Sequence, residues 1–126
     1  MKNKRNSVLI IDDEPANIMV LRQILSPEYL VYVATDGQTG LTVAMKQNPD
    51  VILLDILMPN MDGYEVLTEL RKTVETNRIP VLVVTGLKSE ESEEKAFSLG
   101  ADDYMSKPLN SRILKHRVRN LLKETG

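Results

Sequence analysis

The stretch that decides the fold is VILLDILMPNMDG, residues 51–63. Its first four residues are apolar and run without a break into a single acid, Asp55, and turn-forming residues follow. An uninterrupted apolar run of this length predicts a strand that is buried on both faces of a parallel sheet. Asp55 is then expected at the carboxyl end of that strand, where open α/β sheets bind their ligands. Asp62 is interpreted as part of an Asp-Gly turn.

Apolar runs and helical patterns alternate along the rest of the chain. Strands are predicted for residues 8–11, 30–34, 51–54, 81–84 and 103–105. Helices are predicted for residues 15–25, around 41–45, at 64–72, at 90–99 and from about 110 onward. Five alternations of strand and helix indicate an α/β fold with a parallel sheet and helices on both of its faces.

The composition is that of one globular domain, residues 1–126, and it argues against several classes of protein. With no cysteine, the chain has neither disulfides nor thiolate metal ligands. A net charge of −2 gives no reason to expect nucleic acid as a partner, and no apolar run is long enough for a membrane span. No secretory signal pattern opens the chain, so the cytoplasm is the expected location. Residues 1–6 and 124–126 are expected to be flexible.

Reactive side chains follow four of the five predicted strands. Asp12 and Asp13 follow the first strand, Asp55 the third, Thr85 the fourth and Lys107 the fifth. Because parallel strands point the same way, these side chains should meet at one edge of the sheet. Carboxylates gathered there repel one another unless a cation neutralises them, and oxygen ligands favour Mg²⁺ or Mn²⁺. An ammonium and a hydroxyl beside that cation suit a phosphoryl oxyanion.

Simpler interpretations exist for some of these groups. On their own, Asp12 and Asp13 would be typical of residues that cap the first helix. Thr85 would be typical of a strand residue, and Tyr104 of a residue that is simply packed. Because Lys107 is predicted at the same edge of the sheet, we favour a metal site over helix capping for Asp12 and Asp13.

Four motifs together resemble the receiver domain of two-component response regulators. They are IIDDEP at 10–15, LLDILMPNMDGYE at 53–65, VVTG at 83–86 and GADDYMSKP at 100–108. Their order and spacing resemble those of the family over nearly the whole chain. The resemblance implies a CheY-like, flavodoxin-like (βα)5 fold with strand order 2-1-3-4-5.

The resemblance also implies a role for each site residue, and it implies no cofactor besides the metal. Asp55 would be the phosphoacceptor, Asp12, Asp13 and the backbone carbonyl of Leu57 would bind the metal with it, and Thr85 and Lys107 would contact the phosphoryl group. Tyr104 would be the aromatic switch residue and would enter the space that Thr85 leaves after phosphorylation. Leu57 and Leu87 would tune the lifetime of the phosphoaspartate, and the Lys107–Pro108 bond would take the family's cis-peptide position.

Receiver domains accept phosphoryl groups and are not enzymes in their own right, so the implied partners are proteins. The donor would be a phosphohistidine of a histidine kinase or phosphotransfer protein, because His116 is interpreted as a solvated residue of the last helix. Phosphorylation would change the surface of the fourth helix, fifth strand and fifth helix, and so control an output domain or a downstream protein. The acidic fourth and basic fifth helices would also allow a phosphorylation-dependent homodimer.

Competing functions call for motifs that this chain lacks. A phosphatase of the haloacid-dehalogenase type would have a second aspartate two residues after Asp55, where this chain has Leu57. The dinucleotide-binding pattern GxGxxG and the phosphate-loop pattern GxxxxGK are both absent. A receiver-like interaction module that works without phosphorylation remains the alternative, although such modules usually lose one of the acids or the lysine.

Overall fold

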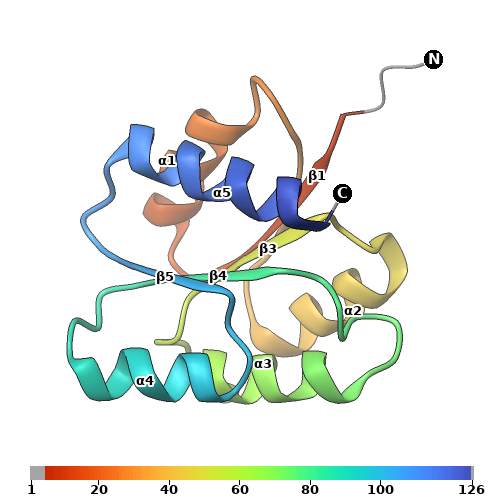
Figure 1. The fold of residues 1–126 in the computed structure, drawn as a ribbon, viewed down its shortest axis with the longest axis vertical. Coiled ribbons are helices and arrows are strands. Elements are labelled where there is room, and N and C mark those ends of the chain that lie inside the picture. The colour runs from red at the N-terminus through yellow and green to blue at the C-terminus, as the bar shows by residue number, and fades with distance from the viewer. Residues whose placement is uncertain (1–4, 126) are drawn as a thin grey trace.

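The computed structural model describes residues 5–125, in which five strands alternate with five helices (Figure 1). The strands are β1 (Ser7–Ile11), β2 (Leu30–Ala34), β3 (Val51–Leu54), β4 (Val81–Thr85) and β5 (Asp103–Ser106). The helices are α1 (Pro15–Leu25), α2 (Gly37–Gln47), α3 (Gly63–Lys72), α4 (Glu90–Ser98) and α5 (Ser111–Thr125). The strands are parallel, in the order β2-β1-β3-β4-β5. The predicted fold class and strand order are confirmed.

The termini that were predicted to be flexible are described only in part. Residues 1–4 and 126 lie outside the described residues. The guanidinium of Arg5 donates to the carbonyl oxygens of Ser26 and Tyr29, and α5 continues to Thr125. The mobility of the two ends stays a prediction.

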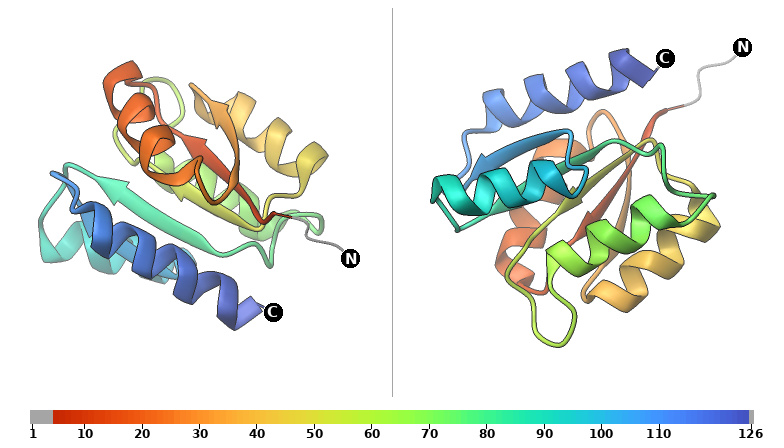
Figure 2. Two further views of the ribbon diagram at one scale, coloured as in Figure 1. Left: turned by 90° about the horizontal axis from the view of Figure 1, so that it is seen from above. Right: turned by 60° about the horizontal axis from the view of Figure 1, so that its bottom comes forward.

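Helices cover both faces of the sheet (Figures 1 and 2). α1 and α5 lie on one face, and α2, α3 and α4 lie on the other. Alternate residues of β1 supply the two cores, with Val8 and Ile10 on the α1 and α5 side and Leu9 and Ile11 on the opposite side. All four side chains are fully buried. This two-sided burial is why residues 8–11 of β1, like β3, are uninterruptedly apolar.

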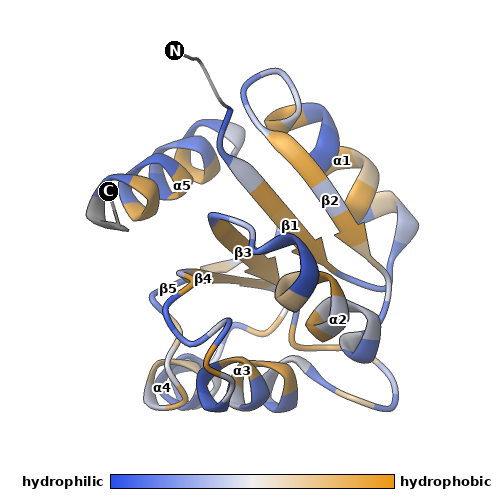
Figure 3. Ribbon diagram, turned by 90° about the vertical axis from the view of Figure 1, so that its right-hand side faces the viewer, coloured by the Kyte–Doolittle hydropathy of each residue, from blue (hydrophilic) through white to orange (hydrophobic). Residues whose placement is uncertain are grey.

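The helices are amphipathic, as Figure 3 shows most clearly for α5, whose surface alternates between hydrophobic and hydrophilic bands. Leu114, Val118 and Leu121 of α5 are buried, whereas Arg112 and Lys123 are exposed. A helix with one apolar stripe packs on the sheet and turns its charged side to water. Within residues 5–125, none of the helices has the length and apolar character needed to cross a membrane.

The start of α3 shows that the turn interpretation of Asp62 is incomplete. Asp62 is the N-cap of α3, and its carboxylate accepts a hydrogen bond from the Glu65 amide at 3.0 Å. The Glu65 carboxylate in turn accepts from the Asp62 amide at 3.0 Å. This reciprocal pair is a capping box, which satisfies two amides that the first helical turn leaves without partners.

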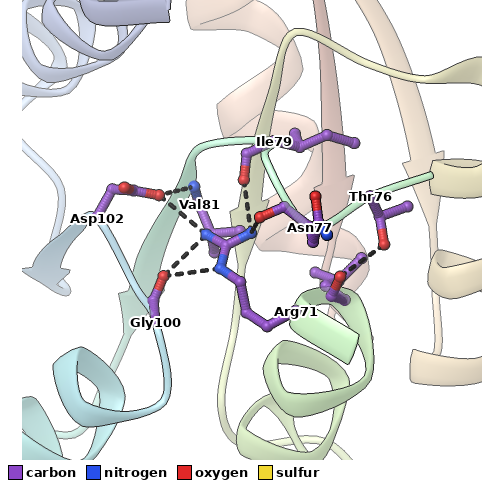
Figure 4. Close-up of polar contacts among 8 residues, drawn as sticks. Arg71, Thr76, Asn77, Ile79, Val81, Gly100 and Asp102 are labelled. Carbon is purple, nitrogen blue, oxygen red and sulfur yellow. Dashed lines mark hydrogen bonds and ion pairs between the residues drawn. The ribbon is translucent and has the colours of Figure 1, made fainter. Parts of the chain in front are cut away.

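One arginine joins two loops at the amino edge of the sheet (Figure 4). Arg71, in the last turn of α3, donates from Nε and Nη2 to the carbonyl oxygen of Gly100, at 3.1 and 2.8 Å, and from Nη1 to that of Ile79, at 2.9 Å. Its Nη2 also lies 3.0 Å from Oδ2 of Asp102, which accepts another bond from the Val81 amide. The α3–β4 and α4–β5 loops are therefore joined through one planar guanidinium.

Candidate functional site

The backbone at the carboxyl edge of the sheet places the predicted site residues. Ile11 pairs in register with the last residue of β3, so Asp12 and Asp55 leave the sheet on neighbouring strands. The Asp55 amide donates to the Ile11 carbonyl at 3.0 Å, and the Lys107 amide donates to the Thr85 carbonyl at 2.8 Å. The strand pairing therefore continues into the site and holds its backbone in place.

Three carboxylates and one ammonium form the centre of the site. Carboxylate oxygens of Asp12, Asp13 and Asp55 all lie within 4.8 Å of one another. Nζ of Lys107 lies 3.2 Å from Oδ2 of Asp12 and 3.2 Å from Oδ2 of Asp55. Asp12 and Asp55 are only 2% and 6% exposed, whereas Asp13 is open to solvent. The structure brings together the four charged side chains that the sequence predicted to converge.

The site holds more negative than positive charge, because one ammonium faces three carboxylates. Burial raises the pKa of the Asp12 carboxyl above its ordinary value, against the opposing effect of the hydrogen bond that it accepts from the Glu14 amide at 3.0 Å. The charge of Asp55 raises the same pKa further, and Lys107 lowers it. A cation added to this pocket would relieve the repulsion and favour the charged forms of the carboxylates.

The ligand chemistry of the pocket fits Mg²⁺ or Mn²⁺. All three clustered ligands are carboxylate oxygens, two of them buried, and hard divalent cations prefer oxygen ligands. The Leu57 amide donates to Oδ1 of Asp55 at 3.3 Å, so the loop after β3 folds back beside the carboxylate. The part of the Leu57 carbonyl as a metal ligand stays a prediction. Glu14 and Gly86 also line the pocket, next to Asp13 and Lys107.

Helix capping does not account for the two N-terminal acids. The N-cap of α1 is Glu14, whose side chain makes no capping bond, and Pro15 follows it. Asp12 and Asp13 precede that position, and their carboxylates lie in the cluster with Asp55.

Thr85 and Tyr104 both contact the loop that follows β4. Thr85 is fully buried, and its Oγ1 accepts a hydrogen bond from the Leu87 amide at 3.4 Å. Tyr104 is already buried, at 8% exposed, and its hydroxyl donates to the Leu87 carbonyl at 3.0 Å. The switch role of both residues stays a prediction, but Tyr104 does not start from an exposed position. The Lys107–Pro108 bond is cis, as the family resemblance implies.

The sequence interpretation missed the reason for Gly63. A Cβ at this position would lie 2.7 Å from the Cα of Ile56 and would clash with the carbonyl oxygen of Asp55. The Gly63 amide donates to the Ile56 carbonyl at 2.9 Å. The start of α3 therefore lies directly against the backbone that carries Asp55, and only glycine fits there. The glycine of MDG was the available signal, but an Asp-Gly turn explained it equally well.

His116 plays no visible part in this pocket. It is exposed on α5 and is not among the residues that line the pocket around Asp55. This position agrees with the interpretation of His116 as a solvated residue.

Comparison with known proteins places this arrangement in a family. Residues 8–119 match the model of the response regulator receiver domain. A Vibrio cholerae protein named "Probable cyclic di-GMP phosphodiesterase" is 40% identical over 116 residues, which cover 92% of this chain and 26% of that protein. Response regulator PleD of Caulobacter vibrioides is 39% identical over 115 residues, or 90% of this chain and 25% of PleD. The chain spans about a quarter to a half of the length of the curated relatives that it matches.

Solved structures agree with the fold and with the chemistry of the pocket. A CheY-like receiver domain protein from Methanospirillum hungatei superimposes with a TM-score of 0.88 at 32% identity, covering 96% of both chains. The receiver domain of a sensor histidine kinase from Pseudomonas aeruginosa superimposes with a TM-score of 0.88 at 27% identity, covering 95% of this chain and 99% of that one. That structure has a magnesium ion coordinated in its active-site cleft.

Proposed function

Because this chain belongs to the response regulator receiver domain family, we propose that Asp55 accepts a phosphoryl group and that the domain relays this change to another domain or protein. One observation carries the proposal. Asp55 is buried, its carboxylate clusters with those of Asp12 and Asp13, and the Lys107 ammonium lies 3.2 Å from its Oδ2. This combination of a nucleophilic oxygen, a set of metal ligands and a cationic partner is what phosphoryl transfer to a carboxylate requires.

In the proposed reaction, a carboxylate oxygen of Asp55 attacks the phosphorus atom of the donor. An O–P bond forms and the P–N bond of the donor's phosphohistidine breaks, so the imidazole nitrogen leaves with the electron pair. Asp12, Asp13, Asp55 and the Leu57 carbonyl would hold Mg²⁺ or Mn²⁺. A bound divalent cation supplies the screening between carboxylate and phosphate that the reaction needs. Lys107 would exchange its carboxylate partners for a phosphoryl oxygen and offset the remaining charge.

Thr85 would respond once the phosphoryl group is in place. The new oxygens on Asp55 would accept a hydrogen bond from the Thr85 hydroxyl, drawing that hydroxyl away from the Leu87 amide. Tyr104 contacts the same loop through the Leu87 carbonyl. A charge added at Asp55 would thus change the surface formed by α4, β5 and α5.

Labelling with a small phosphodonor tests the proposal. Phosphoramidate with Mg²⁺ should phosphorylate the parent protein, and Asp55→Asn should remove the label, because the amide oxygen is a far weaker nucleophile. Asp36→Asn is the matched control, since Asp36 is the exposed N-cap of α2 and asparagine retains that capping. Intact-protein mass and tandem mass spectrometry would read the label and its position. A parent chain that takes no label would contradict phosphoacceptance and favour the interaction-module alternative.

The donor and the target follow from the same proposal. The donor is a histidine kinase or a phosphotransfer protein, and the target is an output domain or a downstream protein, with all of them in the cytoplasm. The similar regulators are longer than this chain, which supports a target outside the receiver domain. The domain itself promotes its own phosphorylation and dephosphorylation and is not a turnover enzyme.

We also propose that phosphorylation promotes a homodimer through α4 and α5. Exposed acids on α4 and exposed bases on α5 give the two helices opposite charge; they are Glu90, Glu91, Glu93 and Glu94, and Arg112, Arg119 and Lys123. Analytical ultracentrifugation with the phosphoryl mimic beryllofluoride should show a larger sedimentation coefficient than without it. A coefficient that stays at the monomer value would exclude this dimer while leaving phosphoacceptance intact.

A further inference from the structure

Glu14 is an exposed acid beside the charged cluster, and its side chain has no capping role. It is the N-cap of α1, a position that usually takes serine, threonine, aspartate or asparagine, and it makes no side-chain capping bond. Pro15 follows it and has no amide proton to offer. Glu14 nevertheless lines the same pocket as Asp55 and Lys107. The presence of an acid here therefore needs another explanation than helix capping.

Asn17 holds the Glu14 side chain in place. Nδ2 of Asn17, in the first turn of α1, donates to Oε1 of Glu14 at 2.6 Å. Asn17 is half-buried, whereas Glu14 is exposed. A short hydrogen bond to a charged acceptor is a strong one, so it restricts a long side chain that water would otherwise leave free. Each carboxylate oxygen carries two lone pairs, so the Glu14 carboxylate can accept further hydrogen bonds while Asn17 holds it.

The backbone of Glu14 is bonded to the carboxylate cluster as well. Its amide donates to Oδ1 of Asp12 at 3.0 Å, while Oδ2 of Asp12 lies 3.2 Å from the Lys107 ammonium. The Glu14 carboxylate is not one of the three whose oxygens lie within 4.8 Å of one another. Glu14 therefore belongs to the layer around the clustered carboxylates.

A carboxylate in that layer has a chemical use when the pocket holds a divalent cation. Mg²⁺ usually keeps several water ligands beside its protein carboxylates, and the protons of those waters need acceptors. Residues that accept bonds from metal ligands commonly change the affinity of a metal site by about 10- to 100-fold. An acid that lines the pocket and is held by a neighbouring side chain suits this role.

We propose that Glu14, held by Asn17, is a positioning residue that accepts a hydrogen bond from water on the bound Mg²⁺ or Mn²⁺. This inference rests on the metal site of the proposed function and adds to it a residue that is not a direct ligand. It also gives a role to Asn17, which carries no charge. Removing Asn17 should therefore weaken metal binding, although the net charge of the protein stays the same.

Mn²⁺ titration, followed by the electron paramagnetic resonance signal of the free ion, measures the Kd directly. Asn17→Ala should raise this Kd severalfold, because Glu14 is no longer held. Gln23→Ala, at an exposed position of the same helix, is the matched control and should bind as the parent does. Urea unfolding without metal identifies conditions in which each variant is folded. Equal Kd values for Asn17→Ala and the parent would overturn the inference.

Charge and positioning are separated by Glu14→Gln. This variant should raise the Kd about tenfold, whereas Glu75→Gln, which removes an exposed acid of the α3–β4 loop, should leave it unchanged. The effect of Glu14→Gln should persist at high ionic strength, where interactions between exposed charges are screened. The double variant with Asn17→Ala should bind no more weakly than Glu14→Gln alone, because Asn17 acts through Glu14.

Two results of this second experiment would also overturn the inference. One is strict additivity of Glu14→Gln and Asn17→Ala, and the other is an effect of Glu14→Gln that salt removes. A parent protein that binds no Mn²⁺ would instead contradict the metal site of the proposed function.

Discussion

At the residue scale, the site is built from charges that the fold holds close together against their repulsion. Lys107 lies 3.2 Å from both buried carboxylates, Asp12 and Asp55, and the exposed Asp13 adds a third negative charge. The arrangement that suits metal binding therefore lowers the stability of the metal-free protein. A carboxylate that helps to hold a divalent cation destabilises the metal-free protein.

Replacing Asp13 by asparagine should separate these two effects. In metal-free buffer, Asp13→Asn should raise the free energy of unfolding by about 1 kcal/mol at low salt, because two neighbouring charges lose their repulsion. The gain should shrink at high ionic strength. Urea unfolding at two salt concentrations would measure it, and Asp36→Asn, at an exposed helix cap, is the control.

Bound Mg²⁺ should make the parent protein more stable than Asp13→Asn, the reverse of the order expected without metal. At 100 times its Kd, Mg²⁺ should stabilise the parent by about 2.7 kcal/mol through preferential binding to the folded state. Asp13→Asn should gain much less at the same concentration, because one of three clustered carboxylates is gone. Thermal unfolding with and without Mg²⁺ gives the comparison. An equal gain in both proteins would place the ion elsewhere.

Leu57, which lines the pocket, and Leu87, on the loop after β4, lead to a prediction about phosphate lifetime. Leu57 is 56% exposed and Leu87 is half-buried, and neither side chain can orient a water molecule for attack on the phosphoaspartate. The phosphorylated domain should therefore be comparatively long-lived. Leu57→Asn or Leu87→Glu should speed the loss of label severalfold, as followed by mass spectrometry. Val74→Asn is the control, because Val74 is 83% exposed on the α3–β4 loop; equal decay in all proteins would contradict the prediction.

At the element scale, the start of α3 and the loop that carries Asp55 are built as one unit. The capping box of Asp62 and Glu65 sets where α3 begins. The next residue, Gly63, then comes so close to the carbonyl of Asp55 that a side chain has no room.

Gly63→Ala should therefore disturb both stability and chemistry. The added methyl group meets backbone atoms rather than a flexible side chain, so we expect a loss of about 2 kcal/mol in the free energy of unfolding. Phosphoramidate labelling of Asp55 should slow, because the carboxylate moves with its backbone. Gly86→Ala is the control for stability, since a Cβ there meets nothing within 4 Å. A Gly63→Ala variant as stable as Gly86→Ala would show that the backbone of Asp55 and Ile56 can shift at little cost.

At the scale of the whole molecule, the carboxyl and amino edges of the sheet carry different kinds of contacts. The carboxyl edge carries the charged site, whereas the amino edge carries the Arg71 contacts that join the α3–β4 and α4–β5 loops (Figure 4). The α4–β5 loop begins with Gly100, whose φ of +109° suits glycine. The Arg71 contacts thus join β4 and β5 at the end of the sheet opposite the site.

Arg71→Lys should weaken the fold without changing the chemistry. Lysine keeps the charge but cannot bond Gly100, Ile79 and Asp102 at once, so we expect a loss of about 2 kcal/mol in the free energy of unfolding. Labelling of Asp55 should be unchanged at temperatures where both proteins are folded. Arg78→Lys, at an exposed position of the α3–β4 loop, is the control. An undiminished free energy of unfolding would show that the Arg71 bonds only replace bonds to water.

The strands whose hydrophobic pattern reflects their burial could be predicted from the sequence. The apolar runs of β1, β3 and β4 are buried on both faces, which is why they lack polar residues and why their ends could be located. The convergence of Asp12, Asp55 and Lys107 follows from parallel strands alone. Asp62 was less predictable, because an Asp-Gly turn and a helix cap use the same residue types.

By itself, the sequence determined the order of elements, the parallel sheet and the edge at which the charged residues meet, since each of these depends on local hydrophobic pattern and chain direction. Only the tertiary structure decided that Tyr104 is buried, that its hydroxyl bonds the Leu87 carbonyl, and that Gly63 lies against Asp55. Arg71 and its partners, 8 and 29 residues away, belong to the same class. These contacts join segments distant in sequence, and only the packed chain brings their atoms within bonding distance.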